Sequence, residues 1–273
     1  MPPPPLSRRD VLRLGGAGLA ACLAGCAGGA SGEIEPQPRK ARLASRPLGG
    51  GNEALEPGTY PLKLRTGRDG LLYVPRCPRR SPTPLVVMLH GAGGSSTRAI
   101  RFLSDLSDQA GFLVLCPDSR GSTWDAITGE FGPDVEFIDR ALAQTFSRCG
   151  VDRRRLAVAG FSDGATYALA LARANGDLFT HAIAFSPGFL LPVDAHGLPR
   201  LFISHGVNDQ VLPIDRASRA MVPELRAAAY RVAYREFDGG HGVPPAIARK
   251  AVEWYLDASN FPTSRVLSEC PAT

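Results

Sequence analysis

Ligand patterns for metals and nucleotides are missing from this chain. Its 273 residues include only five histidines and six cysteines, and neither set has the spacing of a zinc site. The glycine-rich run from Gly91 to Gly94 lacks the G-x-G-x-x-G and G-K-[ST] patterns that hold dinucleotides and phosphates. We therefore expect the protein to use neither a metal nor a cofactor.

Clusters of basic residues are missing as well. The formal net charge is +5, but the lysines and arginines are scattered and are not interleaved with aromatic residues that would stack on bases. This distribution argues against a nucleic-acid partner. There is no internal repeat of solenoid length, and an apolar content of 44% in 273 residues is enough for one sizeable core. We expect one folded domain.

The amino-terminal region lacks an apolar run of the roughly 20 residues that a membrane-spanning helix requires. Arg8 and Arg9 precede a weakly apolar stretch, residues 14–25, that is rich in glycine. The paired arginines resemble a twin-arginine export signal, and Leu23-Ala24-Gly25-Cys26 resembles the lipobox of bacterial lipoproteins. The resemblance implies that residues 1–25 are removed and that Cys26 carries a lipid, which anchors a periplasmic or cell-surface protein without spanning the membrane. A plain secreted protein cut elsewhere is the alternative.

Export changes the interpretation of the remaining cysteines, because disulfides persist in an oxidising compartment. Cys77, Cys116, Cys149 and Cys270 allow three complete pairings. Cys116 lies at the end of an expected strand, on the side of the sheet where the candidate site is expected. The other three cysteines are expected near the opposite ends of the strands. We predict that Cys116 stays reduced and that a bridge forms among the other three.

The composition also predicts how the chain is organised. Residues 26–57 contain few large apolar side chains, so we expect a flexible tether. Strand-like and helix-like segments then alternate, which implies a parallel sheet flanked by helices in a catalytic domain, 58–260, followed by a tail, 261–273. The expected strands are 60–65, 70–74, 85–89, 112–116, 156–159, 181–185, 201–204 and 231–237, and the expected helices are 99–109, 135–147, 163–174, 215–229 and 245–256.

The run Gly160-Phe161-Ser162-Asp163-Gly164 follows an apolar segment, 156–159, and opens an expected helix. That context is typical of a nucleophile elbow, in which a serine occupies a strained turn and glycines on either side avoid collisions between strand and helix. A serine hydroxyl is a weak nucleophile at neutral pH, so it needs a positioned imidazole and a carboxylate. Ser162 is therefore the candidate nucleophile.

The acid and the base are expected downstream of the nucleophile. Asp209 follows the expected strand 201–204 closely, and His241 lies between glycines after the last expected strand. Flanking glycines allow a loop to carry the imidazole across the strand ends. Asp215 and Asp194 are rival acids, but Asp215 lies at an expected helix start, where aspartate is commonly a cap, and Asp194 has no preceding strand. The histidines that fit structural roles are His90, His181, His196 and His205.

Residues from about 85 to 256 resemble the α/β-hydrolase esterases of the phospholipase/carboxylesterase and polyhydroxybutyrate-depolymerase-like group. The resemblance implies the α/β-hydrolase fold, a mostly parallel eight-stranded sheet with helices on both faces. It also implies a triad of Ser162, Asp209 and His241. The oxyanion hole would be built by the amide of Asp163 and that of Ala92, or alternatively of Gly93.

Three aromatic residues are candidates for substrate contact. Trp124 lies in a segment, 116–125, that resembles the loop after the fourth strand of this group, so it either lines the pocket or packs beneath the loop. Phe161 and Phe189 fall near strand ends that face the site. They contribute either to an apolar acyl or aryl pocket or to ordinary core.

A lid domain is not expected, because only residues 186–200 separate two expected strands where lids usually enter this fold. An open site favours small or extended soluble esters over bulk lipid. We expect a serine esterase that forms an acyl-enzyme with a small-molecule or polymer-borne ester. A narrower version releases feruloyl or acetyl groups from polysaccharide, or cleaves hydroxyalkanoate oligomers. The alternatives are a serine peptidase, although peptidases of this fold usually carry a large extra domain, and a non-catalytic lipid-anchored binding protein.

Overall fold

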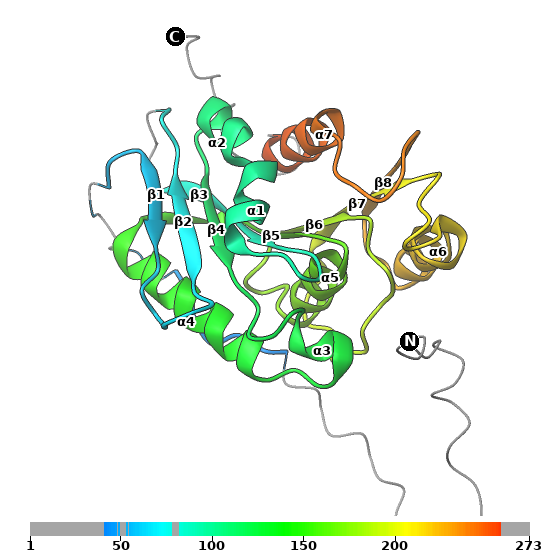
Figure 1. Ribbon diagram of the computed structural model, residues 1–273, viewed down its shortest axis with the longest axis horizontal. Helices are drawn as coiled ribbons and strands as arrows, with labels where there is room; N and C mark the ends of the chain where they lie inside the picture. The colour runs from blue at the N-terminus through cyan, green and yellow to red at the C-terminus, as the bar shows by residue number, and fades with distance from the viewer. Residues whose placement is uncertain (1–40, 48, 50–52, 54, 78–81, 258–273) are drawn as a thin grey trace, which may run out of the picture. The chain divides into compact units, whose positions relative to one another are not determined.

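The computed structural model describes residues 41–47, 49, 53, 55–77 and 82–257 (Figure 1). The predicted export signal, the predicted lipidation site Cys26 and the tail 261–273 lie outside the described residues. None of the described helices is long and apolar enough to cross a membrane.

Eight strands form one sheet in the order β1-β2-β4-β3-β5-β6-β7-β8. β2 runs antiparallel to both of its neighbours, whereas β3 to β8 run parallel to one another. This topology confirms the predicted fold class. The strands are β1 (Gly58–Pro61), β2 (Gly70–Val74), β3 (Thr83–Leu89), β4 (Leu113–Pro117), β5 (Val151–Phe161), β6 (His181–Phe185), β7 (Arg200–Gly206) and β8 (Val232–Phe237).

The helices that flank this sheet are α1 (Ser96–Ala99), α2 (Ser104–Ala110), α3 (Asp125–Thr128), α4 (Pro133–Arg148), α5 (Asp163–Ala174), α6 (Ser218–Ala227) and α7 (Pro245–Leu256). They cover both faces of the sheet (Figure 1). All residues of β3 are buried, so the sheet needs helices on both of its faces. Leu85 and Val87 join the apolar core beneath α4, α5 and α6, whereas Val86 and Met88 join the core beneath α1 and α7.

Two of the expected helices are interrupted. The segment 99–109 breaks at Leu103, whose backbone leaves the helical region (φ −129°, ψ −12°) while its side chain is fully buried. The segment 215–229 breaks at Ala217 (φ −111°, ψ −105°). The short helix α3 was not expected, because four residues are too few for a helical period. β5 starts at Val151 rather than at 156. The apolar pattern does not reveal this first half, because Asp152, Arg153 and Arg154 are polar and partly or fully exposed.

The prediction of a tether through residue 57 is wrong for residues 41–47. Leu43 is only 2% exposed, and its amide donates to Oδ1 of Asn175 at 2.8 Å. Asn175 returns a bond of 2.7 Å from Nδ2 to the carbonyl of Ala41. Arg42 pairs with Asp177 at 2.8 Å. The folded domain therefore begins before Gly58. The buried side chains of Ala41 and Leu43, together with hydrogen bonds and an ion pair, hold this segment against the end of α5.

The cysteine prediction is confirmed in one respect. Cys116 is a reduced, fully buried thiol in β4, and burial raises its pKa. Cys77 is disulfide-bonded. Cys270 lies outside the described residues, so the choice of pairing stays a prediction.

The connection between β6 and β7, residues 186–199, contains no helix. The described part of the chain therefore has no lid domain at this position, as the sequence predicted. The carboxyl ends of β5, β6 and β7 are left uncovered by any inserted domain there.

Candidate active site

Ser162 lies in a sharp turn between the end of β5 and the start of α5. Its backbone has φ +56° and ψ −122°, a region that residues with a side chain rarely adopt. A side chain at Gly160 would collide with the carbonyl of Gly164, and one at Gly164 would collide with the carbonyl of Leu89. The strand, turn and helix thus have the arrangement that the elbow interpretation requires, and the two glycines are needed for their close approach.

Ser162, His241 and Asp209 come together at the carboxyl edge of the sheet. Nε2 of His241 lies 2.9 Å from Oγ of Ser162, and its Nδ1 lies 2.6 Å from Oδ2 of Asp209. An ionised carboxylate only accepts hydrogen bonds, so Nδ1 carries the proton and Nε2 accepts the serine hydroxyl proton. This is the geometry in which an imidazole acts as general base toward a serine.

Asp209 is buried and ionised. Burial opposes the charge, but the amide of Leu212 at 2.8 Å, His241, and the amide of Val211 at 2.9 Å together hold the pKa of Asp209 below its usual value. The rival acids are placed differently, since Asp194 is exposed and Asp215 pairs with Arg219 at 2.9 Å on the surface.

His205 is a further member of the site that sequence reasoning assigned to a structural role. It is fully buried at the end of β7, and its Nε2 lies 2.8 Å from the carbonyl of Leu212 and 3.2 Å from Oδ2 of Asp209. Nδ1 lies 2.7 Å from the hydroxyl of Ser218. Burial lowers the pKa of His205, which keeps the ring neutral. Nε2–H therefore donates to the carbonyl of Leu212, and the ring lies against the carboxylate of Asp209, which His241 also contacts.

Residues 90–94, here called the oxyanion loop, follow β3 and lie against the nucleophile. A Cβ atom at Gly91 would be 3.2 Å from Cβ of Ser162. The amide of Gly93 already donates to the carbonyl of Ser122 at 2.7 Å, so Gly93 is not an oxyanion donor. The amide of Ala92 makes no hydrogen bond to any described residue, and the amide of Asp163 is in the first turn of α5, where it has no partner within the helix. Ala92 and Asp163 are therefore the candidate donors.

The loop between β4 and α4 holds the oxyanion loop and the start of α5 in place. Asp134 accepts the amides of Arg120 at 2.5 Å and of Asp125 at 2.7 Å, and burial raises the pKa of its carboxyl to about 6. The same loop supplies the Ser122 carbonyl to Gly93, and the hydroxyl of Thr123 donates to Asp163 at 2.7 Å. The loop thus contacts both the oxyanion loop and the residue after the nucleophile.

The three aromatic candidates differ in exposure. Trp124 is fully buried, stacks on Tyr167 with ring centroids 5.2 Å apart, and donates from Nε1 to the carbonyl of His90 at 2.8 Å. These contacts match the packing interpretation rather than a pocket wall. Phe161 is half-buried, with its ring 4.8 Å from the imidazole of His241. Phe189 is 45% exposed in the connection after β6.

Comparison with known proteins identifies a matching family profile and two sequence relatives. The profile of the alpha/beta hydrolase fold family matches residues 84–223. A probable feruloyl esterase C of Aspergillus niger is 29% identical over 183 residues, which are 63% of this chain and 65% of that protein. A probable acetylxylan esterase A of the same organism is 29% identical over 129 residues, 44% of this chain and 43% of that protein. The matches span less than two-thirds of either relative.

A solved structure has the same fold. The apo form of esterase 2 from Thermogutta terrifontis superposes with a TM-score of 0.57 and covers 75% of this chain and 95% of its own. At 18% sequence identity this likeness concerns the fold alone.

Replacement of Asp209 by asparagine tests the acid. We expect kcat for p-nitrophenyl acetate to fall on the order of 10³- to 10⁴-fold, because an amide in place of the carboxylate favours the wrong tautomer of His241. Asp215→Asn is the matched control, and its kcat should equal that of the wild type because Asp215 pairs with Arg219 on the surface. Steady-state kinetics of the two variants decide the assignment: full activity in D209N, or an equal loss in D215N, would reject Asp209 as the acid.

Proposed function

The chain belongs to the alpha/beta hydrolase fold family, and we propose that it hydrolyses carboxylic esters through an acyl-enzyme formed on Ser162. The observation that carries the proposal is the continuous chain of hydrogen bonds from Ser162 Oγ through His241 to Asp209, at 2.9 and 2.6 Å. A buried carboxylate, an oriented imidazole and a serine in a strained turn are the parts that activate a hydroxyl for acyl transfer.

In the proposed mechanism, Oγ of Ser162 attacks the ester carbonyl while Nε2 of His241 takes the hydroxyl proton. The negative charge that develops on the carbonyl oxygen is met by the amides of Ala92 and Asp163. The tetrahedral intermediate collapses, His241 returns the proton to the leaving alkoxide, and the alcohol departs. Water then attacks the acyl-enzyme by the same route, which releases the carboxylic acid and restores the serine.

We propose a feruloyl or acetyl ester of a polysaccharide as the substrate class. The names of the two Aspergillus niger relatives support this choice. The chain itself offers exposed apolar side chains in loops at the carboxyl ends of the strands: Phe189 and Val211 are 45% and 66% exposed and follow β6 and β7. The absence of a lid domain among residues 186–199 leaves space for an ester that projects from a polymer.

We also propose that the protein acts outside the cytoplasm, held to a membrane through Cys26. The paired Arg8 and Arg9 and the lipobox-like run before Cys26 support export. The disulfide at Cys77 supports it independently, because structural disulfides persist in oxidising compartments.

Ester hydrolysis by the wild type and its Ser162→Ala variant tests the proposed reaction. With p-nitrophenyl acetate, kcat/KM should fall by at least about 10³-fold in S162A, since the nucleophile is removed. The matched control is Ser147→Ala, an exposed serine of α4, which should retain full activity. Equal rates in wild type and S162A would reject Ser162, and faster cleavage of the anilide analogue than of the ester would indicate a peptidase.

Replacement of Phe189 by alanine tests the apolar contact to the substrate. We expect KM for methyl ferulate to rise about three- to tenfold in F189A, because an aryl group loses part of its buried apolar surface, while KM for p-nitrophenyl acetate changes less. Leu198→Ala removes another exposed apolar side chain from the same connection, 62% exposed, and should leave both values unchanged. An unchanged KM for the ferulate in F189A would remove Phe189 from the proposed site.

Mass spectrometry of the protein recovered from bacterial membranes tests the anchor. The amino-terminal peptide should begin at Cys26 and carry acyl chains, and Cys26→Ser should release the protein into the soluble exported fraction. An unmodified terminus at another residue would support the plain secreted alternative.

A further inference from the structure

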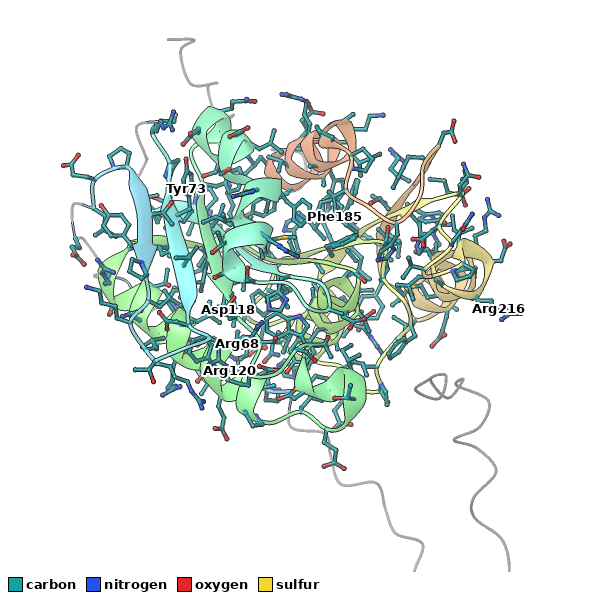
Figure 2. All side chains as sticks on the ribbon, in the orientation of Figure 1. Arg68, Tyr73, Asp118, Arg120, Phe185 and Arg216 are labelled. Carbon is teal, nitrogen blue, oxygen red and sulfur yellow. The ribbon has the colours of Figure 1, made fainter. Side chains whose placement is uncertain are left out.

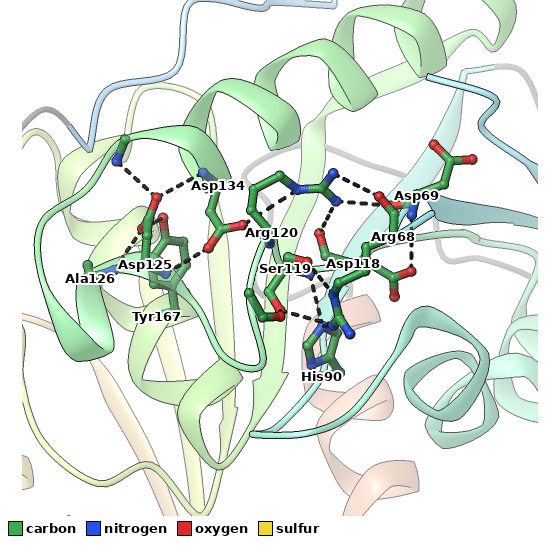
Figure 3. Close-up of polar contacts among 12 residues, drawn as sticks. Arg68, Asp69, His90, Asp118, Ser119, Arg120, Asp125, Ala126, Asp134 and Tyr167 are labelled. Carbon is green, nitrogen blue, oxygen red and sulfur yellow. Dashed lines mark hydrogen bonds and ion pairs between the residues drawn. The ribbon is translucent and has the colours of Figure 1, made fainter. Parts of the chain in front are cut away.

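Arg68, in the connection between β1 and β2, reaches across to the oxyanion loop. Its Nη2 lies 3.1 Å from Nε2 of His90 and donates to the carbonyl of Gly94 at 3.0 Å. Its Nε donates to the carbonyl of Ser119 at 2.5 Å, and its Nη2 also donates to the Ser119 hydroxyl at 3.1 Å. One guanidinium therefore contacts the first residue of the oxyanion loop, His90, and the last, Gly94. Figure 3 shows Arg68 beside His90 and Ser119.

The contacts of His90 determine where its ring carries hydrogen. Nε2 faces two groups that only donate, the guanidinium of Arg68 and the amide of Ser119 at 3.0 Å. Nε2 must therefore be an acceptor, and the hydrogen of the neutral ring is on Nδ1. Burial, with the nearby charge of Arg68 adding to it, lowers the pKa of His90 and keeps the ring neutral, although the Gly91 carbonyl opposes this shift. Nδ1–H donates to that carbonyl at 2.8 Å.

The carbonyl of Gly91 and the amide of Ala92 belong to one peptide group. In a planar trans peptide the C=O and N–H bonds point in opposite directions, so whatever holds one directs the other. Two donors hold the Gly91 oxygen, Nδ1 of His90 at 2.8 Å and the amide of Gly94 at 2.9 Å. The Ala92 N–H is thereby kept pointing away from the His90 ring and free of any bond to the described residues.

We propose that Arg68 is a positioning residue: together with the amide of Ser119, its guanidinium holds the His90 ring with Nε2 as acceptor and Nδ1–H on the Gly91 carbonyl, which sets the direction of the Ala92 amide that receives the oxyanion. The inference rests on the proposed function, because an oxyanion forms only if the chain catalyses acyl transfer. Arg68 acts through His90 and the Gly91–Ala92 peptide group.

The surroundings of Arg68 fix its own position. Nη1 of Arg120 donates to the backbone carbonyl of Arg68 at 2.8 Å, and Arg68, Asp118 and Arg120 lie together beside the sheet (Figure 2). The carboxylate of Asp69 accepts the amides of Lys63 at 2.7 Å and Leu64 at 3.0 Å, which closes the loop that presents Arg68. An ordered loop thus holds Arg68, so that the N–H groups of its guanidinium already point toward the oxyanion loop.

Kinetics of Arg68→Met, with p-nitrophenyl acetate as substrate, give the first test. Methionine retains much of the length of the side chain but donates no hydrogen bond, so kcat should fall on the order of tenfold, a part of the loss seen when an oxyanion donor is removed. KM should stay within about twofold, because the donor acts on the transition state. Arg65→Met, an exposed arginine of the same loop, is the matched control and should behave as wild type. Circular dichroism verifies that both variants fold.

The nitrogen-15 shifts of the imidazoles, recorded on full-length protein labelled at histidine, give a second test that does not depend on activity. His90, assigned with a His90→Gln variant, should show protonated Nδ1 and unprotonated Nε2 in the wild type. In R68M its Nε2 resonance should shift, because Nε2 loses the charged donor and keeps only the Ser119 amide.

The outcomes separate the two hypotheses. A lowered kcat together with a shifted His90 Nε2 resonance supports the positioning role. An unchanged kcat, an unchanged Nε2 resonance, or a raised KM with normal kcat in R68M overturns it while the ester hydrolase stands. A folded wild type that shows the predicted tautomer but cleaves no ester overturns the proposed function instead.

Discussion

The site depends on the close approach of helix α5 to the end of strand β3. Gly164 makes that approach possible, because a side chain there would occupy the space of the Leu89 and His90 carbonyl oxygens. The nucleophile at the start of α5 and the oxyanion loop at the end of β3 are therefore brought into contact by backbone alone. Ser162 therefore adopts a strained backbone conformation. The burial of the apolar core on both sides of the sheet offsets the free-energy cost of that strain.

Three histidines contribute to the site, and hydrogen bonds determine how each ring carries its hydrogen. His241 accepts from Ser162 and donates to Asp209. His205 donates to the carbonyl of Leu212 and lies 3.2 Å from the same carboxylate, while His90 donates to the Gly91 carbonyl in the oxyanion loop. Only His241 faces the nucleophile. The other two are buried and neutral, so they orient the acid and the oxyanion loop without competing for the serine proton.

The sequence predicted the fold class, and the three residues it offered as a candidate triad lie within hydrogen-bonding distance of one another. Both depend on short-range pattern: an apolar strand, a turn and a polar residue at the strand's carboxyl end. It did not predict that residues 41–47 fold, since their partners Asn175 and Asp177 lie more than 130 positions away. The sequence did not predict the contact between Arg68 and His90 either, because it forms only when β2 pairs antiparallel with β4. The choice between Ala92 and Gly93 required the direction of individual amides, which residue types do not specify.

The measurement that tests the central claim most directly is the site of reaction with a fluorophosphonate probe. An activated serine attacks phosphorus and expels fluoride, which leaves a covalent adduct on Oγ. Peptide mapping by mass spectrometry should find one adduct per chain, on Ser162. An adduct on a different residue, or a folded protein that takes up no probe, would contradict the account.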